Sequence, residues 1–181
     1  AEALPEDAPW SDDPLADELP RHTLGKQGLI ALLKGLEATG DAARAESVSR
    51  RLEETYPEVW FLLEGRLRAA RGDVAEAERA FRRAIEIDPR AAEVHWELAR
   101  VLAARGRSDD AVAAYRELVR LEPTHGPGWL ALGRLLLATD RAGAVAALRR
   151  ATDCMPASEE ARRALADAAD AATVEKGSDP P

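Results

Sequence analysis

Apolar residues recur along the chain at intervals of three and four residues, a spacing that predicts a succession of amphipathic helices. Leu29, Leu32, Leu33 and Leu36 form one such set, and this spacing places all four side chains on one face of a helix. No stretch alternates apolar and polar residues for long enough to predict a strand. The pattern therefore predicts an all-α fold.

The helical pattern returns with a period of 34 residues. An alanine, an aromatic residue, an apolar residue and a proline keep the same spacing in two copies. They are Ala77, Phe81, Ala84 and Pro89, and then Ala111, Tyr115, Leu118 and Pro123. Weaker copies end at Pro57 and Pro156. Gly40, Gly72 and Gly106 lie at the predicted ends of helices, where glycine suits the left-handed backbone conformation. A fixed period of this length indicates that one helix–turn–helix unit is stacked several times.

The first half of the unit repeats as well. Trp129-x2-Leu132-Gly133-x2-Leu136 is matched by His95-x2-Leu98-Ala99-x2-Leu102 and by Leu29-x2-Leu32-Leu33-x2-Leu36. Together these residues resemble the tetratricopeptide repeat, whose pattern is W-x2-L-G-x2-Y, then A-x3-F, then P. The resemblance implies a right-handed α-solenoid of four repeats followed by a capping helix.

The period also sets the expected boundaries. We expect an acidic, proline-containing tail at 1–23, repeats over 24–156, a capping helix at 157–173 and a disordered C-terminus at 174–181. The four repeats are expected at about 26–57, 58–89, 90–123 and 124–156.

The second copy departs from the pattern. It has Glu64 and Arg68 where leucine and tyrosine are expected. Its apolar residues are instead Trp60, Leu63, Leu67 and Ala70. We therefore expect the helix over 58–71 to be rotated or docked differently from its counterparts.

The negative charge lies at the ends of the chain. The net charge is −8, of which 1–23 contributes −6 and 157–181 contributes −3, so the repeat body at 24–156 carries +1. This balance argues against general nucleic-acid binding, which needs a basic surface. No run of about 18 apolar residues predicts a membrane span.

The sequence holds no motif that predicts catalysis, a cofactor or a metal site. The histidines, His22, His95 and His125, are isolated, and no nucleotide-binding or metalloprotease motif occurs. His95 stands where the repeat has a packing aromatic residue, so we interpret it as a core or rim residue. Cys154 has no cysteine partner for a disulfide and is expected to be half-buried packing. These observations favour a protein without enzymatic activity.

The resemblance implies a candidate binding groove. In tetratricopeptide proteins the first helix of each repeat lines a concave groove, and the residue after its small Gly or Ala points into it. Here these residues are Lys34, Arg66, Arg100 and Arg134, with Leu62, Trp96 and Leu130 beside them. Such a groove suits an acidic peptide with apolar anchors, because arginine binds carboxylates in a bidentate way and tryptophan is a typical hot spot. The alternative interpretation is a solvated basic face.

Two further details bear on the partner. The chain contains no asparagine, so it does not match the family's clamp for chaperone C-termini, which uses asparagines. The N-terminal tail places Trp10 and Leu15 among acids that include Asp12 and Asp13. It is interpreted either as a solubilising extension or as a self-docking segment that binds its own or a neighbour's groove.

The sequence predicts a non-enzymatic scaffold that binds a partner protein or peptide. The alternatives are an assembly or chaperone factor for secreted or envelope proteins, the regulatory fragment of a larger enzyme, and a module that forms homo-oligomers. The Arg- and Ala-rich composition looks bacterial, and a cytoplasmic or a periplasmic location fits equally well.

Self-docking of the tail predicts competition with a groove ligand. Deleting residues 1–20 should tighten the binding of a groove peptide, because the acidic competitor is removed. Titration of labelled peptide into both forms at low salt measures the effect, and equal affinities would exclude self-docking.

Overall fold

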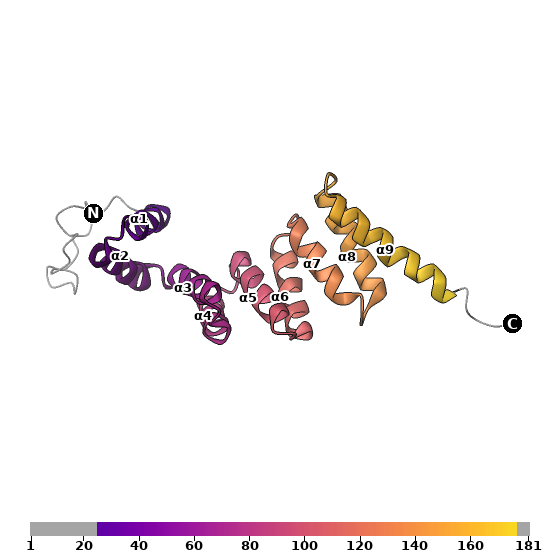
Figure 1. Cartoon of the computed structure of the whole chain (residues 1–181), viewed down its shortest axis with the longest axis horizontal. Helices are drawn as coiled ribbons and strands as arrows, with labels where there is room; N and C mark the ends of the chain where they lie inside the picture. The colour runs from indigo at the N-terminus through magenta and orange to yellow at the C-terminus, as the bar shows by residue number, and fades with distance from the viewer. Residues whose placement is uncertain (1–24, 177–181) are drawn as a thin grey trace. The chain divides into compact units, whose positions relative to one another are not determined.

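The structure is a computed structural model that describes the backbone of residues 25–176 and the side chains of residues 25–169 (Figure 1). Its helices are α1 (Lys26–Thr39), α2 (Ala42–Thr55), α3 (Pro57–Arg71), α4 (Val74–Ile87), α5 (Ala92–Ala104), α6 (Ser108–Leu121), α7 (Gly126–Leu136), α8 (Arg141–Cys154) and α9 (Glu159–Lys176). The described residues form no strand, which confirms the all-α repeat fold. The chain divides into two compact units, 1–63 and 64–181, with the boundary inside α3.

The helices end where the turn residues predict. Gly40, Gly72 and Gly106 have φ angles of 76°, 85° and 71°, in the left-handed region that favours glycine. Helices α4 and α6 end at Ile87 and Leu121, directly before the Asp-Pro and Glu-Pro pairs. Proline disfavours a helical conformation in the residue before it, which accounts for both helix ends.

In the first unit, α1 packs on α2 around a small apolar core. Its buried members are Leu29, Leu33, Val48 and Leu52. Trp60, at the start of α3, packs against this core, and its indole Nε1 donates a hydrogen bond to Ser49 Oγ at 3.0 Å. Ser49 stands where the second and third repeats have the aromatic residues Phe81 and Tyr115, and here the ring of Trp60 from the next helix contacts it instead.

In the second unit, small residues let paired helices approach closely. Ala77, Ala99, Ala111 and Ala144 have no exposed surface. Gly133 of α7 lies so close to α8 that a Cβ atom there would be 2.6 Å from Leu148 Cγ. Gly65 of α3 lies equally close to α4, because a Cβ atom there would be 2.5 Å from Phe81 Cε1. The two helices within a repeat therefore pack closely.

Helix α3 differs from its sequence-based prediction. Leu67 is 46% exposed and Ala70 is also exposed, so neither lies on a buried face. The buried residues are instead Val59, Leu62 and Gly65. Gly65 keeps a close-approach position against Phe81, as Gly133 does against Leu148, and the expected difference in docking stays a prediction. Glu64 and Arg68, at the unusual positions, form an ion pair with each other at 3.3 Å.

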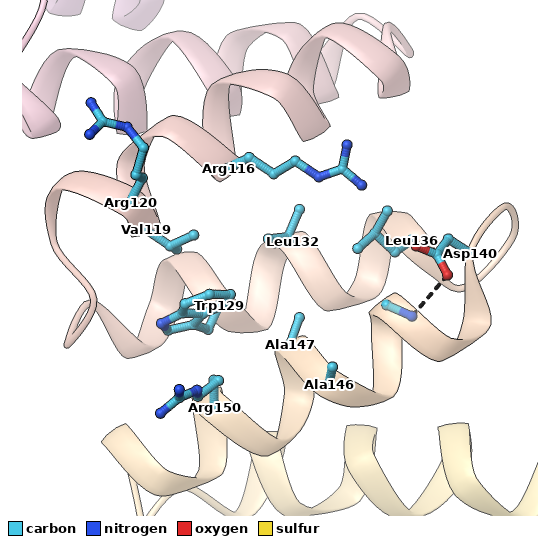
Figure 2. Close-up of a pocket in the computed structure, with 11 residues that line it drawn as sticks. Arg116, Val119, Arg120, Trp129, Leu132, Leu136, Asp140, Ala146, Ala147 and Arg150 are labelled. Atoms are coloured by element: carbon cyan, nitrogen blue, oxygen red, sulfur yellow. Dashed lines mark hydrogen bonds between the residues drawn. The ribbon is translucent and has the colours of Figure 1, made fainter.

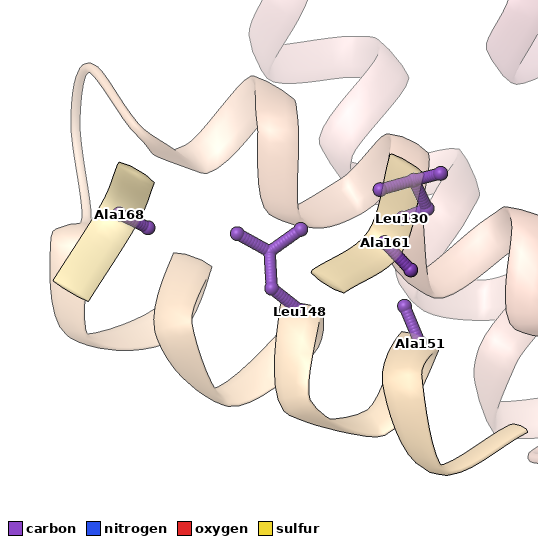
Figure 3. Close-up of a cluster of buried hydrophobic side chains, with 5 residues drawn as sticks. All are labelled: Leu130, Leu148, Ala151, Ala161 and Ala168. Atoms are coloured by element: carbon purple, nitrogen blue, oxygen red, sulfur yellow. The ribbon is translucent and has the colours of Figure 1, made fainter. Parts of the chain in front are cut away.

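Helix α9 covers the end of the repeat array. Leu130 of α7, Leu148 and Ala151 of α8, and Ala161 and Ala168 of α9 form one buried cluster (Figure 3). This helix continues to Lys176, past the end expected at residue 173 and into the segment predicted to be disordered.

Matched glycine substitutions test the close approach. Gly133→Ala should destabilise the protein by about 1–3 kcal/mol, because the added Cβ overlaps Leu148 in a filled core. Gly35→Ala should instead stabilise it by about 0.5–1 kcal/mol, because Gly35 lies within α1 with open space around it. Urea unfolding of each variant measures both effects, and equal shifts for the two would contradict the packing argument.

Candidate functional site

The predicted groove residue Arg66 is held by two glutamates of the next repeat. From α3, its Nη2 lies 2.6 Å from Glu93 Oε1 and its Nε lies 2.8 Å from Glu97 Oε1, both on α5. Burial lowers the pKa of Arg66, but the hydrogen bonds to Glu93 and Glu97 and their charges raise it overall. The guanidinium is therefore charged and already neutralised by protein carboxylates.

Glu97 connects Arg66 with the next predicted groove residue, Arg100. The Glu97 side chain is only 13% exposed, and its Oε2 accepts a hydrogen bond from Arg100 Nη1 at 3.1 Å. One carboxylate thus serves two arginines from α3 and α5. We call Arg66, Trp96, Glu97 and Arg100 the first-helix face of the second unit.

Trp96 provides an aromatic surface on this face. The guanidinium carbon of Arg100 lies 5.9 Å from the centroid of its ring, within the range of a cation–π contact. His125 and Tyr115 contact the same ring, with centroids at 5.0 Å and 5.7 Å. Tyr115 is buried, and this burial raises the pKa of its hydroxyl. Trp96 itself is half-buried, so its ring is held in place and remains partly accessible.

Arg134 repeats the pattern seen at Arg66. From α7 it forms an ion pair with Glu160 of α9 at 2.7 Å, so a carboxylate two helices further along the chain again neutralises the arginine. Arg100 has no such partner, because α7, the first helix of the next repeat, contains no Asp or Glu. Its ion pair is with Glu97 of its own helix. Arg100 is therefore the predicted groove arginine that is least committed to the next repeat.

The remaining predicted site residues have different environments. Leu130 is 7% exposed within the cluster under α9, and Leu62 is buried. Neither is an apolar anchor open to a ligand, which corrects the sequence-based assignment. Lys34 is an exposed residue of α1 in the first unit. The tail residues Trp10, Asp12, Asp13 and Leu15 lie outside the described residues.

Comparison with known proteins identifies the family. The family model of the tetratricopeptide repeat matches residues 62–126 and 105–157, together more than half of the chain. The chain belongs to the tetratricopeptide repeat family. A comparison with curated protein sequences finds no match.

Several solved structures share the fold. The first such domain of Spaghetti (RPAP3), bound to the HSP90 peptide SRMEEVD, is 16% identical with a TM-score of 0.60, covering 64% of this chain and 93% of that one. The Sgt2 domain from Aspergillus fumigatus is 21% identical with a TM-score of 0.60, covering 70% and 87%. MamA is 15% identical with a TM-score of 0.66, covering 80% and 86%.

Two equivalent repeat positions hold a ring nitrogen that donates a hydrogen bond to a proline carbonyl. His95 Nε2 donates to the carbonyl of Pro89 at 2.9 Å, and Trp129 Nε1 donates to the carbonyl of Pro123 at 2.8 Å. Each bond ties the start of a repeat to the proline that ends the preceding one. The interpretation of His95 as a structural residue is confirmed. Cys154 is half-buried, also as expected.

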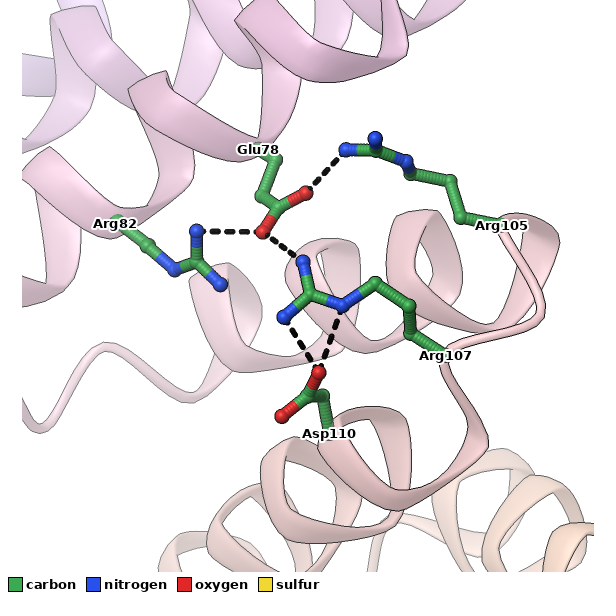
Figure 4. Close-up of polar contacts among 5 residues, drawn as sticks. All are labelled: Glu78, Arg82, Arg105, Arg107 and Asp110. Atoms are coloured by element: carbon green, nitrogen blue, oxygen red, sulfur yellow. Dashed lines mark hydrogen bonds and ion pairs between the residues drawn. The ribbon is translucent and has the colours of Figure 1, made fainter.

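A second polar cluster joins neighbouring repeats at Glu78 (Figure 4). This α4 residue is 3% exposed. Its carboxylate contacts Arg82 at 2.5 Å, Arg105 at 2.6 Å and Arg107 at 2.6 Å. Arg107 also pairs with Asp110 in the first turn of α6. The sequence analysis missed this cluster, because its members come from two repeats and no local motif marks them.

The charges around Glu78 determine its protonation. Burial alone raises the pKa of Glu78, but the hydrogen bond from Arg107 and the charges of Arg82, Arg107 and Arg105 lower it overall. A lowered pKa means that the ionised carboxylate stabilises the fold at neutral pH. This arrangement links α4 to the turn between α5 and α6 and indicates a structural role.

The described residues contain no group of three metal-ligating side chains. Among them, no helix is both long and apolar enough to cross a membrane.

Replacing Glu78 tests the cluster. Glu78→Gln should destabilise the protein by about 1–3 kcal/mol at neutral pH, because three guanidinium groups lose a charged acceptor. The difference from wild type should shrink as the pH falls through the lowered pKa of Glu78, where the wild-type carboxyl becomes neutral.

The matched control is Glu86→Gln on the same helix, where an exposed pair with Arg83 should contribute less than about 1 kcal/mol. Urea unfolding at a series of pH values measures both variants. A pH-independent loss in Glu78→Gln would assign the effect to packing instead.

Proposed function

We propose that this tetratricopeptide protein is a non-enzymatic scaffold whose first-helix face binds an acidic segment carrying an apolar anchor. The observation that carries the proposal is the pairing of Arg100 with the partly accessible ring of Trp96. Arg100 is exposed, and α7, the first helix of the next repeat, contains no carboxylate residue. A partner carboxylate fills that place.

The other arginines define where the partner binds. Arg66 and Arg134 are paired, at 2.6–2.8 Å, with glutamates two helices further along the chain. A ligand gains little by competing with these short contacts. At Arg100 it gains a bidentate, charge-assisted contact, which is stronger than a neutral hydrogen bond. The adjacent Trp96 supplies the large aromatic surface typical of binding hot spots.

A structural neighbour supports this class of ligand. The peptide named with the Spaghetti (RPAP3) domain, SRMEEVD, has three carboxylate side chains beside apolar Met and Val. That domain shares only the fold with this chain, at 16% identity. Because this chain has no asparagine, we assign carboxylate recognition to arginine. The assembly-factor, enzyme-fragment and homo-oligomer alternatives stay predictions.

Peptide selection tests the proposal. A displayed library of random dodecapeptides is selected on the full chain, and enriched peptides are synthesised for fluorescence anisotropy. We expect sequences that combine Asp or Glu with Leu, Met, Phe or Trp. Arg100→Glu and Trp96→Ala should each weaken these peptides by about tenfold or more, and added salt should weaken binding to the wild type.

The matched control is Arg149→Glu, which makes the same charge change at an exposed position of α8. It should leave the affinity within about twofold of wild type. If no enriched peptide distinguishes Arg100→Glu from wild type, ligand binding at the first-helix face is excluded.

A further inference from the structure

A separate apolar pocket lies among α6, α7 and α8 (Figure 2). Its volume is about 470 Å³, within the size range of ligand-binding pockets. Trp129, Leu132 and Leu136 line it from α7, and Ala146 and Ala147 line it from α8. The packing of the repeat array therefore leaves an apolar hollow between the second helices of two consecutive repeats.

This pocket is distinct from the first-helix face. Leu132 and Leu136 each lie two residues from Arg134 along α7. Residues two positions apart in an α-helix are rotated by about 200° around its axis, so their side chains point to nearly opposite sides. Arg134 belongs to the side that meets Glu160 of α9, whereas the leucines face α6 and α8. A ligand of one surface leaves the other free.

Arginines surround the apolar floor on both sides. Figure 2 shows Arg116 and Arg120 on α6 and Arg150 on α8, beside Trp129. Arg120 is paired with Glu117 at 2.5 Å. Arg116 and Arg150 are exposed, and the described residues offer neither of them an ion pair or a hydrogen bond. Two guanidinium groups thus remain for a ligand.

The acidic residue of the pocket is already engaged. Asp140 Oδ1 accepts a hydrogen bond from the Gly143 backbone N at 2.8 Å and caps the N-terminus of α8 (Figure 2). Its carboxylate serves the helix end rather than the arginines. The pocket therefore combines an apolar floor with uncompensated positive charge on two opposite helices.

We infer that this pocket is a second docking site, for a protein segment that carries a bulky apolar side chain between acidic residues. The apolar side chain fills the space over Leu132 and Leu136, and the flanking carboxylates meet Arg116 and Arg150. Arginines on both sides of the floor fit a segment that crosses from α6 to α8. Charge complementarity favours an acidic protein segment over nucleic acid, because the chain as a whole carries −8.

The test uses the 181-residue chain with its first-helix face disabled. The displayed dodecapeptide library is selected on the Arg100→Glu variant and counter-selected on the same variant carrying Arg116→Glu and Arg150→Glu. We expect enriched peptides with acids on both sides of Leu, Phe or Trp. When Arg116→Glu and Arg150→Glu are introduced together into the otherwise wild-type chain, the affinity for these peptides should fall by about tenfold or more. Added salt should weaken the binding of the peptides to the wild type.

A second variant blocks the floor without changing charge. Ala146 is exposed and lines the pocket, so Ala146→Phe fills the apolar space and should weaken the same peptides by a similar factor. Arg149→Glu is the charge control and should have less than about a twofold effect. Circular dichroism establishes that each variant keeps its helices.

The outcomes separate this inference from the proposed function. Peptides that depend on Arg116 and Arg150 but bind Arg100→Glu normally support the pocket, whether or not the first-helix face binds anything. If the selected peptides bind the double variant and Ala146→Phe with unchanged affinity, the pocket proposal is overturned. A labelled oligonucleotide or dodecanoate that requires Arg116 and Arg150, in the absence of any such peptide, also overturns it and assigns the pocket to another ligand class.

Discussion

The close approach of paired helices in the second unit is the constraint on which its surfaces depend. Gly65 lies directly against Phe81, and Gly133 lies directly against Leu148, with no room for a Cβ atom at either glycine. Such contacts fix the rotation of each first helix about its axis, because any other rotation places a side chain in the gap. Once α7 is fixed, Arg134 faces α9 while Leu132 and Leu136 face α6 and α8.

Electrostatic pairing between consecutive repeats adds a second level of order. Arg66 meets Glu93 and Glu97, and Arg105 and Arg107 meet the buried Glu78. Each pair connects elements about one repeat apart, so the charges that join repeats are largely neutralised. The arginines of the two proposed binding surfaces lie outside this scheme. They are Arg100, whose ion pair is with Glu97 of its own helix, and Arg116 and Arg150, which line the pocket among α6, α7 and α8.

The two tryptophans of the second unit, Trp96 and Trp129, differ by one position in the repeat and lie on different surfaces. Trp129 and His95 occupy equivalent positions, and each donates a hydrogen bond to the proline carbonyl of the preceding repeat. Trp96 follows His95 by one residue, which turns its side chain by about 100° around the helix. As a result, Trp96 contacts Arg100 whereas Trp129 lines the pocket between α6 and α8. The same residue type thus contributes to two separate surfaces.

The sequence alone determined the helical repeat and its turns, because these depend on periodicity and on local chemistry. Gly40, Gly72 and Gly106 could be assigned to left-handed turns without coordinates. Only the tertiary structure decided which charges are free and which apolar residues are covered. Leu130 occupies the same repeat position as Trp96, yet α9 buries it, and Arg66 is neutralised by residues about 30 positions away. Such pairings depend on how neighbouring repeats face one another across space, and no local spacing in the chain records that.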